Sequence, residues 1–264
     1  MKEVKVKILI LNYNGKILLK ECLDSVMAIN YSDYSVVLID NNSTDNSVEY
    51  VKSQYVKVEI VETGKNRFYG GGYNYFFKRD SEECFYLILN NDTIVDKNIL
   101  RDMIAGVNKY GKENLYGPRI MFAKERDKIW YAGGKVNLYR GIIEHIGIRK
   151  KLKEIDINDS PTDYITGCCM LIHSSSISRL NGFDCSFKMY MEDVDLCMRA
   201  RSIGLKSYFL SSPFLYHHVS RTVSNKIFRI ICSYIKLSIK YTGVHFLFNV
   251  PIFVLRKIIS KIVC

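Results

Sequence analysis

Acidic residues are missing from the last quarter of this 264-residue chain. No Asp or Glu follows Asp195, whereas residues 196–264 hold 11 of the 38 Lys and Arg residues. Subtracting these 11 from 38 leaves 27 basic side chains in residues 1–195, against 27 acidic ones, so the formal net charge of +11 comes entirely from the end of the chain. Such an asymmetry is typical of a segment that meets an anionic partner, either a nucleic acid or a membrane surface.

Other features are missing as well. No apolar stretch precedes the first predicted strand, so the N-terminus does not resemble a secretory signal. No run of about 18 uncharged apolar residues is present, and we therefore expect no membrane-spanning helix. The eight cysteines form no C-x-x-C pair and no spacing typical of zinc. Reduced cysteines in a cytosolic protein are the simplest interpretation.

Residues 85–93 are the stretch around which the rest of the chain is organised. Five apolar or aromatic residues, 85–89, run directly into Asn90, Asn91 and Asp92. A short apolar run of this kind is typical of a strand buried on both faces in a parallel sheet, and open α/β sheets bind ligands at the carboxyl ends of their strands. The same polar residues also occur in ordinary turns and helix caps, so this stretch alone leaves metal or phosphate binding open.

Two other apolar runs, in residues 4–11 and 36–39, end in the same way. The polar residues that follow them are Asn12, Tyr13, Asn14 and Asp40. Apolar residues at helical spacing follow each run, and a third strand is predicted at 57–61 before a short helix and the 85–89 strand. This β-α-β-α-β order predicts a parallel, doubly wound sheet, in which the polar strand ends share one edge.

A glycine-rich segment, residues 64–74, precedes the short helix. A crevice lined by carboxylates and amides, beside glycines that let backbone approach a ligand, suits a nucleotide with a metal-bound diphosphate. The segment has neither the P-loop spacing nor the position of a dinucleotide-binding G-x-G-x-x-G motif.

The second half of the chain is less regular. We expect a helix at 99–107, strands at 117–122 and 164–173, and a short helix at 174–180. Residues 123–162 are predicted to form loops and hairpins over the active edge, where specificity is usually determined.

Glu192 and Asp193 open a further helix, because apolar residues recur at helical spacing after them. Two acidic residues in a first turn can simply complement the helix dipole. A carboxylate pair at the mouth of a site can instead supply a general base. The spacing alone leaves both interpretations open.

Taken together, these stretches resemble the family 2 glycosyltransferases, inverting enzymes with a GT-A fold, and in particular their rhamnosyltransferase-like branch. The resemblance covers about residues 5–222. The matching stretches are 11–14, 38–45, 66–74, 89–93, 166–170 and 182–200.

The resemblance implies a role for particular residues. A nucleotide-sugar donor would be bound by Asn12, Tyr13, Asn14, Asp40, Asn66, Gly71, Asn74 and Asn91. The DxD metal motif of the family falls on Asn90-Asn91-Asp92, which leaves Asp92 as the main carboxylate ligand beside Asn90. His217 matches a late histidine that closes the metal site, although the adjacent His218 stays open as the ligand. Asp193 matches the catalytic base, with Glu192 beside it.

The resulting hypothesis is a metal-dependent transfer of a sugar from a UDP- or dTDP-sugar to a hydroxyl of a glycan or lipid-linked glycan, in the assembly of cell-surface polysaccharides. Oxygen ligands with one imidazole suit Mn²⁺ or Mg²⁺ better than zinc. One alternative is a nucleotidyltransferase that makes a nucleotide-sugar, although residues 12–15 offer no basic side chain for the α-phosphate. Another is a non-catalytic membrane-binding protein with a degenerate nucleotide fold. No groove-reading motif indicates a nucleic acid partner.

We divide the chain into a GT-A domain, 1–222, and a basic amphipathic helical extension, 223–264. The apolar residues expected on one face of its first helix are Ile227, Phe228, Ile230, Ile231, Tyr234, Ile235, Leu237 and Ile239. Residues 244–255 are apolar but interrupted by Pro251, and lie in a membrane interface more readily than they span a bilayer. We therefore predict a peripheral protein at the inner face of the cell membrane, with packing on the domain or a homodimer as the alternative.

Overall fold

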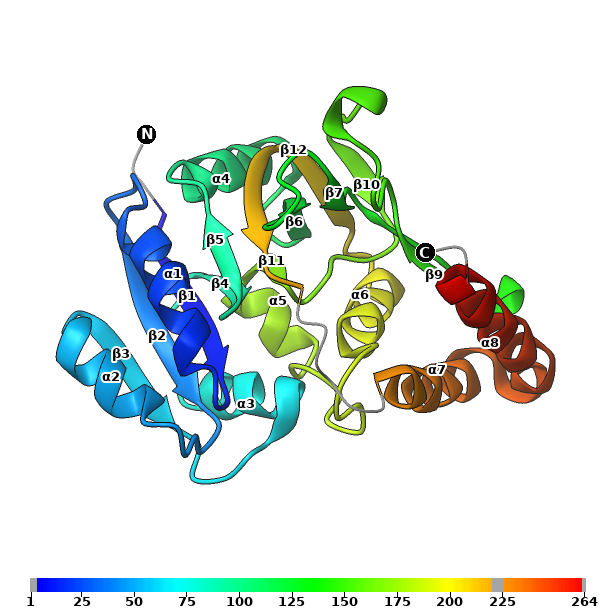
Figure 1. Cartoon of the computed structure of the whole chain (residues 1–264), viewed down its shortest axis with the longest axis horizontal. Coiled ribbons are helices and arrows are strands. Elements are labelled where there is room, and N and C mark those ends of the chain that lie inside the picture. Colours follow the sequence, from blue (N-terminus) through cyan, green and yellow to red (C-terminus); the bar gives the residue numbers. More distant parts are fainter. Residues whose placement is uncertain (1–3, 220–225, 263–264) are drawn as a thin grey trace.

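The computed structural model describes residues 4–219 and 226–262, the last four of these by backbone alone. Its centre is one large sheet with helices against both faces (Figure 1). Four parallel strands form one half in the order β3-β2-β1-β4. Their bounds are β1 Val6–Asn12, β2 Tyr34–Asp40, β3 Val58–Glu62 and β4 Phe85–Asn90.

The helices of this half connect the strands. They are α1 Lys16–Met27, α2 Ser47–Gln54 and α3 Phe68–Phe77. The strands form where continuous apolar runs can be buried on both faces, and residues 87–89 are fully buried. The register pairs Asn12 with Asp40 and Leu11 with Asn90. The polar residues that end three strands therefore lie at one edge, as predicted.

The other half of the sheet is mixed. Strand β11, Cys169–His173, runs antiparallel between β4 and β6, Leu115–Phe122. β11 begins near the carboxyl end of β4, where Cys169 pairs with Leu89, and runs back along β4 from there. The long strand β12, Ser207–His217, is parallel to β6. The predicted α/β class with a mostly parallel central sheet is confirmed, with β11 as its main exception.

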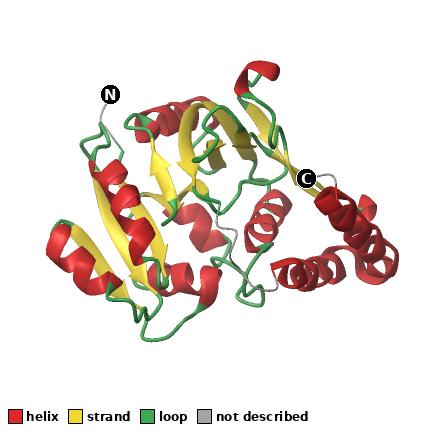
Figure 2. Cartoon of the chain, in the orientation of Figure 1, coloured by secondary structure: helices red, strands yellow, loops and turns green. Residues whose placement is uncertain are grey.

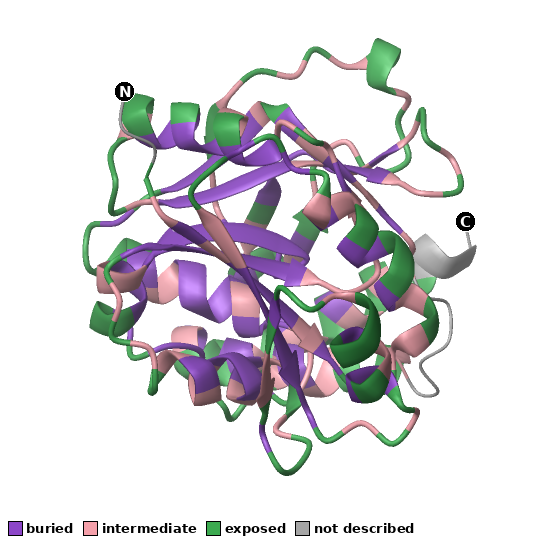
Figure 3. Ribbon diagram, turned by 90° about the vertical axis from the view of Figure 1, so that its left-hand side faces the viewer, coloured by how far each residue is buried: buried purple, intermediate pink, exposed green. Residues whose placement is uncertain are grey.

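Residues 123–162 form the predicted hairpins and loops. Their strands are β7 Ile129–Tyr131 and β10 Ser160–Thr162, which join the large sheet, and β8 Gly134–Asn137, which pairs with β9 Ile142–His145. A further short strand, β5 Thr93–Val95, lies earlier in the chain and also joins the large sheet. The 3-10 helices are η1 Leu138–Arg140 and η2 Leu152–Glu154, and the helices of this half are α4 Ile99–Tyr110, α5 Ser174–Arg179 and α6 Glu192–Ser202. The strands of the large sheet are mostly buried and the outer faces of the helices exposed (Figure 3).

The glycine-rich segment differs from its prediction. Gly70, Gly71 and Gly72 lie inside α3 rather than in a ligand-binding loop. A Cβ atom at Gly72 would lie 2.4 Å from Leu11 Cδ1, and one at Gly70 would lie 2.7 Å from Phe183 Cβ. A Cβ atom at Gly70 would have no room beside Phe183 Cβ, and one at Gly72 would displace the tip of Leu11. Close packing of α3 explains these glycines, and a sequence does not distinguish it from close approach of a ligand.

The C-terminal extension is a helical hairpin, visible beside α6 in Figures 1 and 2. It consists of α7 Lys226–Thr242, η3 Gly243–His245 and α8 Phe246–Ile262. Gly243, at φ 54°, makes the bend, and the rings of Tyr234 and Phe253 stack 3.7 Å apart across the hairpin. The proposed domain boundary at 222/223 lies outside the described residues.

One expectation about this extension is wrong: Tyr234 and Leu237, assigned to a membrane-facing surface of α7, are fully buried against the protein. The absence of a membrane-spanning helix stays a prediction. By length and composition alone, the helical stretch Lys226–Ile258 in the described part of the chain is apolar enough to cross a membrane, although the structure divides it into α7, η3 and α8. A sequence search for an uncharged run misses it because the stretch contains widely spaced Lys and Arg residues.

Candidate active site

The three polar strand ends form one hydrogen-bonded cluster. Asn12 Nδ2 donates to Asp40 Oδ1 and to Ser43 Oγ, both at 3.1 Å, and Asn12 Oδ1 accepts from Asn91 Nδ2 at 2.8 Å. The other carboxylate oxygen of Asp40 accepts from the Ser43 N–H at 2.8 Å. Because Asn12 and Asp40 are buried, the cluster is held rigidly at the carboxyl ends of the strands.

The residues next to this cluster are more exposed. Asn14, at φ 52°, accepts a hydrogen bond from the Thr44 N–H at 2.7 Å, and Asn66 accepts one from the Phe68 N–H at 2.8 Å. Tyr13 is exposed, with 51% of its surface accessible. Of the predicted donor residues, Asn12, Asp40 and Asn91 therefore share the cluster, and Tyr13 and Asn14 lie in the turn after β1.

Two predicted donor residues lie elsewhere. Asn74 Oδ1 accepts from the Phe183 N–H at 2.9 Å and Asn74 Nδ2 donates to the Phe183 carbonyl at 2.8 Å, so its amide is used to hold the backbone after α5. Gly71 faces Arg67 within α3, where a Cβ atom would lie 3.1 Å from Arg67 Cβ. The structure does not bring either residue to the strand-end cluster.

The histidine that pairs with Asp92 is His217. Its Nε2 atom lies 3.2 Å from Asp92 Oδ1, whereas His218 Nε2 pairs with Glu21 Oε2 at 2.6 Å near the surface. Asn90, whose side chain is half-buried, ends β4 two residues before Asp92. His217 is the last residue of β12 and His218 follows it, and their side chains have different partners, which a pattern in the sequence cannot distinguish.

The residues present fit a divalent cation. Asp92 Oδ1 and His217 Nδ1 are buried side-chain atoms without a hydrogen-bond partner. The separation of 3.2 Å between Asp92 Oδ1 and His217 Nε2 is close to the distance of about 3 Å between neighbouring ligands of an octahedral ion. Among the described residues, no three His, Cys, Asp or Glu side chains are placed so that together they could hold a metal ion, so substrate or solvent would have to supply the other ligands.

Trp130 packs on the imidazole ring of His217 and was not among the residues predicted for the site. Its ring lies 4.5 Å from that of His217 and 4.4 Å from that of His145, both edge to face. It is the only tryptophan in the chain, and this is the feature of the sequence by which it could have been selected as a candidate site residue. The contact orients the imidazole of His217, whose Nδ1 has no hydrogen-bond partner.

Glu192 and Asp193 open α6 beside the loop before β11. Asp193 Oδ2 accepts from the Gly167 N–H at 2.9 Å, and its other oxygen accepts from the Val194 N–H at 2.8 Å. Glu192 is buried, and its Oε2 atom has no hydrogen-bond partner. Burial raises the pKa of both carboxyls, and the nearby Asp193 raises that of Glu192 further, to about 8.

These contacts assign the charge within the pair. Two N–H donors stabilise the ionised form of Asp193, whereas no donor reaches Glu192 Oε2. Asp193 therefore carries the negative charge at neutral pH and Glu192 retains its proton. An ionised, half-buried carboxylate is suited to accept a proton from a bound hydroxyl.

Comparison with known proteins identifies the chain. Residues 7–180 match the model of the family described as glycosyl transferase family 2. The chain belongs to this family. The predicted class of enzyme, a glycosyltransferase, is thereby confirmed, and the alternatives of a nucleotidyltransferase and of a non-catalytic protein are not retained.

Similar family 2 sequences include two rhamnosyltransferases. Rhamnosyltransferase WbbL of Escherichia coli is 25% identical over 236 residues, which cover 85% of this chain and 88% of WbbL. N-acetylglucosaminyl-diphospho-decaprenol L-rhamnosyltransferase of Mycobacterium tuberculosis is 24% identical over 206 residues, covering 70% of this chain and 66% of that protein. The match thus spans just under two thirds of the mycobacterial relative.

Solved structures of low sequence identity share the fold. GalNAc-T7, crystallised with UDP, GalNAc and Mn²⁺, superposes with a TM-score of 0.72 at 14% identity, over 92% of this chain and 49% of that one. The mannosyltransferase PcManGT of Pyrobaculum calidifontis, in complex with GDP-Man and Mn²⁺, gives a TM-score of 0.65 at 13% identity, over 91% and 65% of the two chains. The predicted GT-A fold is confirmed.

The protonated carboxyl in this family 2 site makes stability depend on pH. A glutamate in the unfolded chain loses its proton near pH 4.3, whereas Glu192 in the folded chain does so at about 8. Because this pKa is raised on folding, the contribution is fully present below the unfolded pKa and is lost as the pH rises to about 8. Glu192→Gln removes this dependence.

We expect Glu192→Gln to melt close to the wild type at pH 4.5 and about 10 °C or more above it at pH 8.5. The rise of the pKa on folding to about 8 corresponds to about 5 kcal/mol, and each kcal/mol shifts the melting temperature of a chain this size by about 2–4 °C. Thermal unfolding followed by circular dichroism at both pH values measures the difference. Glu59→Gln, at an exposed position of β3, is the matched control and should change neither value. An equal difference at both pH values would show that Glu192 titrates normally.

Proposed function

We propose that the chain transfers a hexose from a UDP- or dTDP-sugar to a hydroxyl of a glycan or lipid-linked glycan, with inversion at the anomeric carbon. The observation that carries the proposal is the buried pair Asp92 and His217 next to the strand-end cluster of Asn12, Asp40 and Asn91. The cluster has amide and carboxylate groups that could form hydrogen bonds with the base and ribose of the nucleotide-sugar donor. The names of the two rhamnosyltransferases support a sugar donor and, for one of them, a diphospho-lipid acceptor.

Asp92 and His217 are the residues that would hold the cation, with Asn90 as a further oxygen donor. When bound, Mn²⁺ or Mg²⁺ supplies a Lewis acid that stabilises the departing nucleoside diphosphate. The Mn²⁺ present in the crystals of GalNAc-T7 and in the PcManGT complex supports this choice of ion.

Asp193 accepts the proton of the acceptor hydroxyl as its oxygen bonds to the anomeric carbon. The bond from that carbon to the diphosphate oxygen breaks with its electron pair on the leaving group. Attack from the face opposite the leaving group inverts the configuration. The Gly167 and Val194 N–H groups hold the carboxylate of Asp193 during this step, and Glu192, protonated, adds no second negative charge beside it.

A panel of nucleotide sugars tests the proposal. The purified chain is incubated with UDP-, dTDP- and GDP-sugars, Mn²⁺ and membrane glycolipid extract, and release of nucleoside diphosphate is followed. We expect release from a UDP- or dTDP-sugar that requires the extract. Absence of release from every donor would contradict the proposed transfer, and release from GDP-sugars alone would contradict the donor class.

We also propose that the hairpin docks on an anionic membrane through the outer face of α8. Exposed apolar residues lie along that face: the adjacent Leu247 and Phe248, followed at spacings of four, three and three by Ile252, Leu255 and Ile258, with the exposed Val244 of η3 just before α8. Every charged residue after Asp195 is basic, and each cation near an anionic leaflet contributes about 1 kcal/mol. Such docking would place the enzyme at the inner face of the membrane, beside a lipid-linked acceptor.

Point variants on α8 test the docking without removing α7, which is packed on the domain. Phe248→Ser combined with Leu255→Ser should reduce co-sedimentation with vesicles containing phosphatidylglycerol by roughly tenfold, because two exposed apolar side chains leave the interface. Ile17→Ser, at an exposed residue of α1, is the control and should bind like the wild type. Equal binding of all three proteins would contradict docking through α8, as would equal binding to neutral vesicles.

A further inference from the structure

The segment that leads into α6 is held by one face of α7. Ser233 Oγ donates to the Met189 carbonyl and Lys236 Nζ to the Ser186 carbonyl, both at 2.8 Å. Lys240 Nζ lies 2.7 Å from Asp184 Oδ2. Ser233, Lys236 and Lys240 are spaced by three and four residues, so they lie along the same side of the helix.

The end of this segment has an unfavourable backbone conformation. Tyr190 and Met191 both have φ 69°, in the left-handed region that residues with side chains seldom adopt. Met191 is the N-cap of α6 and makes no side-chain capping hydrogen bond. Each such residue costs about 1–3 kcal/mol, and the conformation persists only where surrounding contacts enforce it. The contacts from α7 are suited to that role, and Glu192 and Asp193 follow directly.

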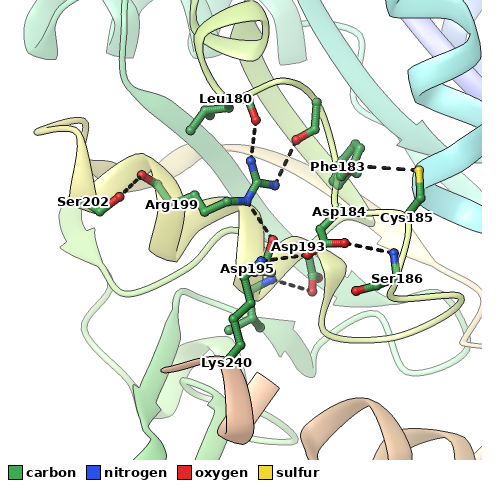
Figure 4. Close-up of polar contacts among 12 residues, drawn as sticks. Leu180, Phe183, Asp184, Cys185, Ser186, Asp193, Asp195, Arg199, Ser202 and Lys240 are labelled. Atoms are coloured by element: carbon green, nitrogen blue, oxygen red, sulfur yellow. Dashed lines mark hydrogen bonds and ion pairs between the residues drawn. The ribbon is translucent and has the colours of Figure 1, made fainter. Parts of the chain in front are cut away.

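Lys240 joins both ends of the segment. Besides Asp184, its Nζ lies 2.6 Å from Asp195 Oδ1 in the first turn of α6 (Figure 4). Asp195 is fully buried and also binds Arg199 Nε at 2.8 Å and the Tyr241 hydroxyl at 2.8 Å. The guanidinium of Arg199 donates in turn to the carbonyls of Leu180 and Gly182.

We propose that Lys240 is a positioning residue for the transfer reaction: it ties α7 to Asp184 and Asp195, closes the 184–191 segment onto α6, and thereby fixes the direction of the Asp193 carboxylate. The inference rests on the proposed role of Asp193 as base. It gives the C-terminal hairpin a role in turnover that is separate from membrane docking, because the contacts come from α7 and the exposed apolar face belongs to α8.

Lys240→Met tests the proposal, because methionine keeps most of the apolar stem and removes the charge. Asp195 retains Arg199 and Tyr241, so the chain should still fold. We expect kcat to fall by about 10–100-fold, the range for a catalytic group misplaced by up to about 1 Å, with the KM for the donor changed less than about threefold. Lys240→Arg should recover most of the loss.

Lys226→Met is the matched control, since it removes the same charge from the same helix without touching residues 184–195, and it should behave like the wild type. Hydrogen exchange of the amides of 184–196 provides a readout that needs no activity, and we expect faster exchange in Lys240→Met alone. A wild-type kcat in Lys240→Met, or an equal loss in Lys226→Met, would overturn the proposal. Should the wild type transfer no sugar, the proposed function fails, and unchanged exchange in Lys240→Met would still overturn the tie between α7 and α6.

Discussion

Asp193→Asn is expected to lower kcat by about 10²–10⁴-fold, the usual effect of removing a positioned general base. Asparagine has the shape of aspartate, and its single oxygen can still accept one of the two N–H groups, from Gly167 or Val194. Asn12 and Asp40 of the strand-end cluster are not altered, so the affinity for nucleoside diphosphate, measured by calorimetry, should stay within about twofold.

Glu192→Gln is the comparison that makes this result specific. Burial and the nearby Asp193 raise the pKa of Glu192 to about 8, so it is protonated at neutral pH. Because glutamine reproduces this neutral form, transfer at pH 7 should change by less than about tenfold. If Glu192→Gln abolished transfer and Asp193→Asn did not, the roles of the two carboxyls would have to be exchanged.

Asp92→Asn is expected to abolish transfer and to remove the dependence of nucleotide binding on Mn²⁺. The substitution replaces the one carboxylate beside His217 Nε2, and even the loss of an outer-shell partner weakens metal binding by about 10–100-fold. Chelation of the wild type should have the same effect on transfer.

Trp130 provides a direct readout of the ion. Its ring lies 4.5 Å from that of His217, so Mn²⁺ bound there with nucleotide should quench the fluorescence of this single tryptophan in the wild type and in His218→Ala. Quenching should be lost in Asp92→Asn and His217→Ala. Full transfer in excess chelator, or equal quenching in all four proteins, would contradict the assigned ion site.

The parallel half of the fold follows from local signals in the sequence. Three apolar runs that end in Asn12, Asp40 and Asn90 are long enough for buried strands. Apolar residues at helical spacing lie between these runs, and this alternation predicts a doubly wound sheet. Contacts within a few residues and the shared direction of the strands decide this part, so the strand-end cluster could be predicted.

Other features depend on packing between distant segments. In the sequence, Gly70 and Gly72 are typical of a ligand-binding loop. The structure shows instead that α3 packs on Phe183 and Leu11 at these two positions. Asn74 matches a donor position, but its amide is used by the Phe183 backbone, more than 100 residues away in sequence.

The same holds for the C-terminal hairpin. Tyr234 fits the apolar spacing of an amphipathic helix. Only the tertiary structure shows that the face on which it lies packs against the protein. Lys240 is one basic residue among many in the sequence, and its contacts with Asp184 and Asp195 exist only after α7 has docked.

The central claim is that this site transfers a sugar by a single displacement with Asp193 as base. Its most direct test is the anomeric configuration of the product formed from the active nucleotide sugar, determined by NMR from the one-bond coupling at the anomeric carbon. We predict a glycoside whose configuration is opposite to that of the donor, formed by the wild type and not detectably by Asp193→Asn. A product with the configuration of the donor, or equal formation by both proteins, would contradict the account.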